Sequence, residues 1–104
     1  MMGADYYSAD SEDGDRIEDP SEDALFMMLG DLDEAGNTFL VISPAAADAG
    51  WSVSVALLGK GVYEVVRRDS GRGERAVSRS AVIDDIARDL TRWLAARDAG
   101  RTAP

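Results

Sequence analysis

Hydrophobic and small polar residues alternate most regularly over residues 51–57, and this alternation predicts a β-strand with one buried face. The glycines on either side of Lys60 follow immediately and predict a tight hairpin, because glycine tolerates the positive φ of such turns. Residues 62–68 would then return antiparallel. The buried face would consist of Trp51, Val53, Val55 and Leu57, and the outward face of Ser52, Ser54 and Ala56.

Two further strands are predicted from shorter patterns. Residues 38–42 are β-branched and hydrophobic and end at Ser43 and Pro44, which is typical of a short buried strand. Residues 69–73 are rich in small and glycine residues and predict a turn, followed by a short fourth strand over 74–77.

The strands are preceded and followed by amphipathic helices. Asp19 is the expected N-cap of the first helix, with Pro20 at the first helical position and Glu22 completing a capping box. Ser78 or Ser80 would cap the second helix, which we expect to end at Gly100. The hydrophobic stripes consist of Leu25, Met28, Leu29 and Leu32 in the first helix, and of Val82, Ile83, Ile86, Leu90, Trp93 and Leu94 in the second.

The order α-β-β-β-β-α predicts an α+β fold. Short turns between consecutive strands favour an antiparallel four-stranded meander, and the N- and C-terminal helices would cover one of its faces. The result is a two-layer sandwich with the other face of the sheet partly open. We expect a single domain over 19–98, a disordered acidic arm over 1–18 and a flexible tail over 99–104.

Charge is distributed unevenly along the chain. Residues 1–34 contain twelve acidic residues and one basic residue, Arg16, whereas 35–104 contain eight acidic and ten basic residues, and the net charge is −9. This acidity argues against general nucleic-acid binding and against binding to anionic membranes. The first residues lack the pattern of a secretory signal, so we expect a cytoplasmic protein.

Composition also limits the chemistry. The chain has no cysteine and no histidine, which removes thiol nucleophiles, disulfides, the commonest general base and the commonest zinc ligand. The acidic run over residues 10–19 does not fit an EF-hand calcium loop. If Gly14 is placed at the invariant glycine of that loop, then Ala9 and Pro20 occupy its first and last ligand positions, and neither can bind calcium through a carboxylate. We therefore expect no metal, no cofactor and no catalytic residues.

Three groups of residues are candidates for contact with a protein partner. The first is the acidic arm, the second the outward serines of the predicted strand 51–57, and the third an arginine cluster that starts at residue 67 and ends at Arg79. This cluster could also serve as a charged turn and strand edge. The candidates are Asp10, Glu12, Asp13, Asp15, Ser52, Ser54, Arg67 and Arg68.

Residues 19–95 resemble a largely uncharacterised group of small bacterial α+β proteins. The resemblance lies in the helix opened by Asp19-Pro20-Ser21, the strand 38–42, the segment 62–67 and the closing helix. Some members of that group resemble immunity proteins of polymorphic toxin systems. The resemblance implies binding to a protein partner and carries over no catalytic residues.

These observations favour a non-enzymatic protein-interaction module of the bacterial cytoplasm, with an immunity-like protein as one version. Its partner would be a protein, and a basic one would suit the acidic arm. One alternative is a small ligand-binding domain or enzyme that uses carboxylates such as Glu64, Asp84 and Asp85. Another is a structural homodimer.

Overall fold

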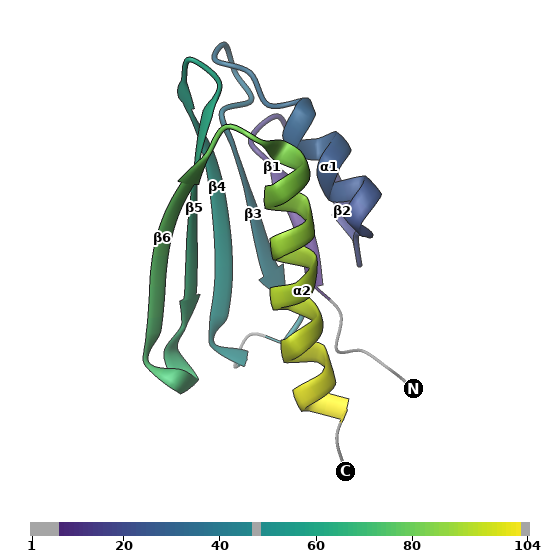
Figure 1. Cartoon of the computed structure of the whole chain (residues 1–104). Helices are drawn as coiled ribbons and strands as arrows, with labels where there is room; N and C mark the ends of the chain where they lie inside the picture. Colours follow the sequence, from purple (N-terminus) through teal and green to yellow (C-terminus); the bar gives the residue numbers. More distant parts are fainter. Residues whose placement is uncertain (1–6, 47–48, 103–104) are drawn as a thin grey trace.

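The computed structural model describes residues 7–46 and 49–102, whose strands form one antiparallel sheet with helices on one side (Figure 1). In chain order the elements are β1 (Tyr7–Ser11), β2 (Arg16–Glu18), α1 (Glu22–Gly30), β3 (Phe39–Pro44), β4 (Trp51–Gly59), β5 (Val62–Asp69), the short 3-10 helix η2 (Ser70–Arg72), β6 (Glu74–Ser80) and α2 (Ile83–Thr102).

The expected α+β class and antiparallel sheet are confirmed, but the strand number is wrong. The described residues form a six-stranded sheet in the order β2-β1-β3-β4-β5-β6. Strands β3 to β6 are the predicted meander, and the β1–β2 hairpin extends it beyond β3. The last strand of the meander also runs to Ser80 rather than ending near residue 77.

The two additional strands come from the segment expected to be a disordered arm, and for residues 7–18 that expectation is wrong. β1 pairs with β3 on one side and with β2 on the other, so both edges of its backbone are hydrogen-bonded. Ala9 is fully buried and Ser11 nearly so. Backbone hydrogen bonds and the burial of a few small residues therefore offset the entropy lost when residues 7–18 become ordered, although this segment has no run of hydrophobic residues. Residues 1–6 lie outside the described residues.

Helix α1 begins two residues later than predicted. The hydroxyl of Ser21 accepts a hydrogen bond from the backbone N–H of Ala24 at 3.1 Å, which makes Ser21 the N-cap. Asp19 has a φ of +50° and donates its backbone N–H to the carbonyl of Tyr7, so it completes the β1–β2 pairing instead.

Helix α2 begins close to the predicted position and ends later. The hydroxyl of Ser80 accepts a hydrogen bond from the N–H of Val82, as expected for a serine at a helix start. The helix continues through Gly100 to Thr102, so the expected tail over 99–104 is helical as far as 102. Residues 103–104 lie outside the described part of the chain.

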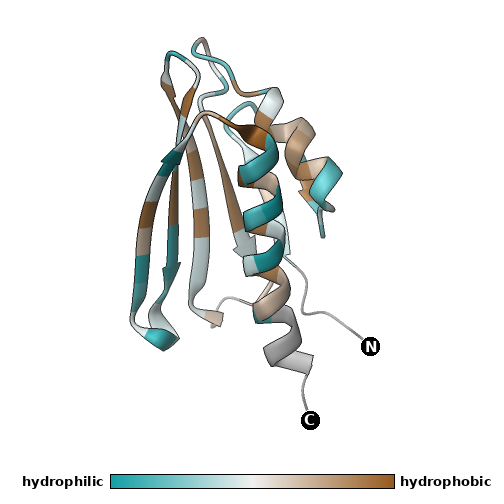
Figure 2. Ribbon diagram, viewed as in Figure 1, coloured by the Kyte–Doolittle hydropathy of each residue, from teal (hydrophilic) through white to brown (hydrophobic). Residues whose placement is uncertain are grey.

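The core lies between the sheet and the two described helices. Alternation along β4 is confirmed: Trp51, Val53 and Val55 are buried, and Ser52 and Ser54 lie on the other face. Figure 2 shows this alternation along the strands and the hydrophilic outer side of α2. The buried hydrophobic residues form one cluster: Ala9, Leu25, Met28, Leu29, Leu32, Leu40, Ile42, Trp51, Val53, Val55, Val65, Ile86, Ala87, Leu90 and Leu94.

The predicted hairpin between β4 and β5 is also confirmed. Lys60 has a φ of +56° and Gly61 a φ of +74°, the two successive positive values of a type I′ turn. This turn, together with the bulge between Leu57 and Gly59, sets the antiparallel register of β4 and β5 and therefore decides which side chains of the two strands share a face.

Candidate protein-interaction surface

The face of the sheet opposite α1 and α2 is uncovered by the described residues. Residues directly opposite one another on neighbouring antiparallel strands share a face, so the strand register assigns each side chain to one side. We call the uncovered side the open face. It consists of Arg16 and Glu18 on β2, Ser8 and Asp10 on β1, Phe39, Val41 and Ser43 on β3, Ser52, Ser54 and Ala56 on β4, Glu64, Val66 and Arg68 on β5, and Arg75, Val77 and Arg79 on β6.

Hydrophobic side chains on the open face remain in solvent. Phe39 is 39% exposed and Val77 is 49% exposed, although neither lies at a chain end or in a loop. Val41 and Val66 lie between them in the same sheet and are half-buried. Isolated exposed hydrophobic residues are normal, but several on one flat, uncovered sheet face are typical of a surface that contacts another protein.

The middle of the open face carries no charge. β3 presents Phe39 and Val41, and β4 presents their direct partners Ala56 and Ser54. In these two rows large side chains therefore stand on β3 and small ones on β4, whereas Ser43, further along β3, is small. The side chains of Phe39 and Val41 therefore protrude further from the sheet than those of Ala56 and Ser54.

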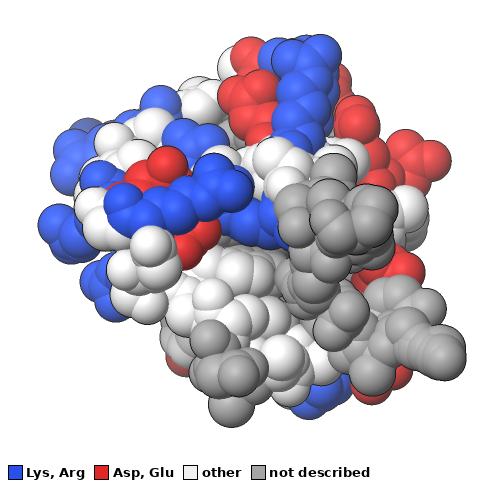
Figure 3. Space-filling view, turned by 90° about the horizontal axis from the view of Figure 1, so that it is seen from below, with Lys and Arg blue, Asp and Glu red and all other residues white. Residues whose placement is uncertain are grey.

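The two sides of the open face have opposite charge. On the β1–β2 side, Asp10 and Glu18 outnumber Arg16, which lies 3.6 Å from Asp10 and 4.0 Å from Glu18. Figure 3 shows Lys and Arg gathered on the side of the molecule where β5 and β6 lie.

The basic side is more strongly charged than one ion pair can neutralise. Arg79 pairs with Glu64 at 3.1 Å. Arg68 and Arg75 are opposite each other on β5 and β6, and within residues 7–46 and 49–102 neither has an ion pair. Two adjacent free guanidinium groups are thus available to an acidic group on a partner.

The structure brings together only some of the residues proposed from sequence. Asp10, Ser52, Ser54 and Arg68 share the open face. Arg67 has its side chain on the opposite face. There it lines a groove of about 240 Å³ between β5, β6 and α2, with Val65, Asp85, Ile86, Asp89 and Leu90 among the other lining residues.

The remaining acidic candidates lie in the turn between β1 and β2, where they have structural hydrogen bonds. Asp13 accepts from the N–H of Asp15 at 3.0 Å, and its own N–H donates to Asn37. Glu12 accepts from both the N–H and the hydroxyl of Thr38, at 2.8 and 2.7 Å. These two hydrogen bonds hold the pKa of Glu12 below its ordinary value. The turn carboxylates thus tie the hairpin to the start of β3.

Sequence reasoning missed Phe39, Val41 and Val77 as members of the open face, whereas Arg75 and Arg79 belong to the arginine cluster that it proposed. The hydrophobic run over 38–42 gave no indication of which of its residues would face outward. The signal lies in the register: once Phe39 is opposite Ala56, it must share the face of Ser54. That register depends on turns and long-range pairing, which hydrophobicity alone does not reveal.

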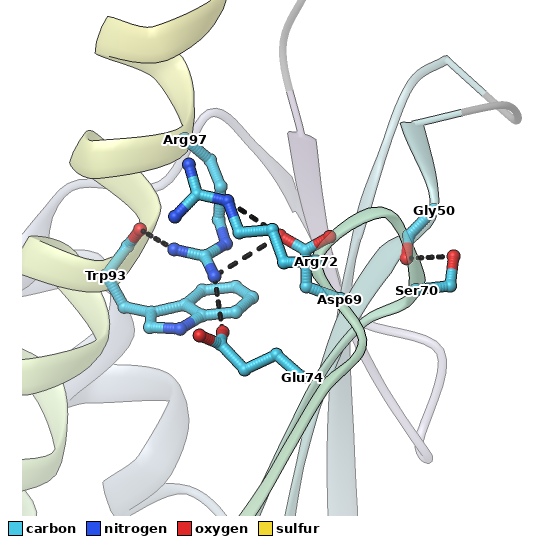
Figure 4. Close-up of polar contacts among 7 residues, drawn as sticks. All are labelled: Gly50, Asp69, Ser70, Arg72, Glu74, Trp93 and Arg97. Atoms are coloured by element: carbon cyan, nitrogen blue, oxygen red, sulfur yellow. Dashed lines mark hydrogen bonds and ion pairs between the residues drawn. The ribbon is translucent and has the colours of Figure 1, made fainter.

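A cluster of charged residues between α2 and the β5–β6 connection supports the fold (Figure 4). The guanidinium of Arg97 lies 3.4 Å above the ring of Trp93 and contacts Asp69 at 3.3 Å and Glu74 at 2.6 Å. The Arg97 and Asp69 side chains are only 7% and 8% exposed. Because Asp69 and Glu74 flank η2, this cluster fixes the C-terminal half of α2 to the β5–β6 connection.

The carboxylates that an enzyme would need are separated. Glu64 lies on the open face with Arg79, whereas Asp85 lies on α2 and accepts a hydrogen bond from Arg88 at 2.8 Å. Among residues 7–46 and 49–102, no three acidic side chains come together as a metal site. No helix in that part of the chain is both long and hydrophobic enough to span a bilayer.

Comparison with protein families, with curated proteins and with solved structures finds no match to this chain.

Proposed function

We propose that this protein is a non-enzymatic interaction module that binds a protein partner through the open face. The observation that carries the proposal is the uncovered sheet face itself, with Phe39 and Val77 in solvent at its middle and edge. A sheet with helices on one side normally leaves its other side polar. Here hydrophobic residues interrupt that side, and a partner that covered them would remove their area from water.

The charges of the open face would add specificity to such binding. Arg68 and Arg75 on one side, and Asp10 and Glu18 on the other, would steer a partner into one orientation and reject the reverse one. Exposed charges contribute little affinity by themselves, so we assign most of the binding energy to the central hydrophobic residues.

The test is retention of a partner by the immobilised chain, with variants that separate the two sides of the molecule. The face variant carries Phe39→Asp and Val77→Asp. The control carries Met27→Asp, because Met27 is 67% exposed on α1, away from the open face. Circular dichroism establishes that all three chains are folded.

We expect wild type and the Met27→Asp control to retain the same protein from a lysate of the cells that produce this chain, and the face variant to lose it. Equal retention by all three chains would place the binding surface elsewhere and refute the proposal. A wild-type chain that retains neither another protein nor a second copy of itself would refute it as well.

A further inference from the structure

The two halves of the open face, on either side of the line between β3 and β4, are complementary to each other in charge and in side-chain size. This line is the middle of the sheet, with β1 and β2 on one side and β5 and β6 on the other. The first half is acidic and the second basic. The two central strands differ as well, because in the rows of Phe39 and Val41 β3 presents large side chains and β4 small ones.

Two copies of such a face can meet about a two-fold axis in two principal ways. If the axis runs across the strands, β6 lies over β6 of the second copy, and arginines meet arginines. If it runs along the strands between β3 and β4, then β2 lies over β6 and β1 over β5. The second arrangement places the acidic half of each copy on the basic half of the other.

We infer that the partner on the open face is a second copy of this chain, bound about a two-fold axis that runs along the strands between β3 and β4. The inference rests on the proposed function and names its partner. In this arrangement β3 of each copy faces β4 of the other, so Phe39 and Val41 meet Ala56 and Ser54. Large side chains thus oppose small ones in both copies.

The charged residues meet at the rim of this dimer. Glu18 and Arg75 belong to the same row across the sheet, at opposite ends. The two-fold axis places each near the other in the second copy. Packed sheets cross at about −30°, which shifts rim residues along the strand by about 6 Å, a distance that an arginine side chain spans. The Glu18 side chain is 79% exposed, so no other residue has to be displaced before it reaches a partner.

The open face is large enough for a stable contact. The strand spacing of about 4.8 Å makes it about 24 Å wide from β2 to β6, and its length ranges from about 10 Å at the three residues of β2 to about 30 Å at the nine residues of β4. With the relief of its side chains, this area approaches the roughly 800 Å² that each partner contributes to a standard interface.

Pairing through the β6 edge is the competing way to form a dimer. In an antiparallel β6–β6 pair centred on Val77, Arg75 of one copy would be opposite Arg79 of the other. Like charges directly opposite are destabilising, so the sequence of β6 disfavours this pairing. The two arrangements also respond differently to charge reversal at Arg75, which makes them distinguishable.

The experiment measures the dimer dissociation constant of the full chain by sedimentation velocity, for wild type and four variants. Glu18→Arg and Arg75→Glu each place like charges together at two symmetric positions, and the double variant restores opposite charges. Arg92→Glu, on the exposed side of α2, is the control. All variants are at exposed positions, and circular dichroism reports whether each is folded.

We expect each single reversal to raise the dissociation constant about tenfold, and the double variant to recover most of that loss. The control should resemble wild type. Tighter association of Arg75→Glu alone would indicate β6 edge pairing and overturn the inference. Wild type that sediments as a monomer at every concentration would overturn it too, while retention of a different protein in the lysate experiment would still support the proposed function.

Discussion

Arg97 offers the sharpest test of how α2 is held to the sheet. Its guanidinium is buried, stacks on Trp93 and contacts Asp69 and Glu74 across the gap between α2 and the β5–β6 connection. Arg97→Ala removes all of these contacts and leaves the buried carboxylate of Asp69, among the described residues, with only Arg72 as an ion-pair partner, whose Nε lies 3.8 Å away.

The expected loss follows from the cost of an uncompensated buried charge. Removing one partner of a buried ion pair costs about 3–5 kcal/mol. Two features place Arg97→Ala at the lower end of this range, about 3 kcal/mol. Arg72 still neutralises part of the Asp69 charge, and the Nε of Arg97 is itself buried without a hydrogen-bond partner among the described residues. Such a loss is a large fraction of the stability of a small domain.

Urea unfolding followed by circular dichroism measures this difference. The matched control is Arg92→Ala, an exposed arginine on the same helix, which should change the free energy of unfolding by less than about 0.5 kcal/mol. A double-mutant cycle with Asp69→Ala should show that the two losses are less than additive. Equal stability of the Arg97→Ala and Arg92→Ala variants would refute the role assigned to the cluster.

Two further predictions concern the β1–β2 hairpin. Ala9→Asp should destabilise the fold by about 2–7 kcal/mol in urea unfolding, because Ala9 is fully buried, whereas Asp10→Asn on the open face should be nearly neutral; equal, small effects would mean that β1 does not belong to the core. Glu12→Gln should lower the melting temperature at neutral pH and have less effect as the pH falls. The hydrogen bonds from Thr38 lower the pKa of Glu12 in the folded state, so its contribution is present above the unfolded-state pKa and is lost on acidification through the folded-state pKa. A constant difference between Glu12→Gln and wild type across the acid range would contradict this assignment.

Local patterns predicted the middle of the fold well and its N-terminal edge poorly. The alternation over 51–57 and the glycines around Lys60 define β4 and its hairpin, because both signals arise within a few residues. β1 has no such signal: its stability comes from pairing with β3, more than twenty residues later in the chain. Acidic composition suggested disorder, but Ala9 and Ser11 are small enough to be buried beneath the helices.

The candidate surface was only partly predictable for a related reason. Ser52 and Ser54 were correctly assigned to the outward face, because the alternation of one strand is sufficient for that. Arg67 and Arg68 were grouped by sequence, although adjacent residues of a strand face opposite sides. Phe39 was expected in the core, since hydrophobicity does not distinguish the two faces of a strand whose register is unknown.

The central claim, that the open face contacts protein, is tested most directly by site-specific photo-crosslinking. A benzoylphenylalanine placed at Phe39 samples the open face, and one placed at Met27 samples the exposed side of α1. We predict that irradiation of cells that express each variant yields a discrete covalent adduct from position 39, with the mass of a dimer of this chain, and none from position 27. No adduct from position 39, or adducts of equal yield from both positions, would contradict the claim.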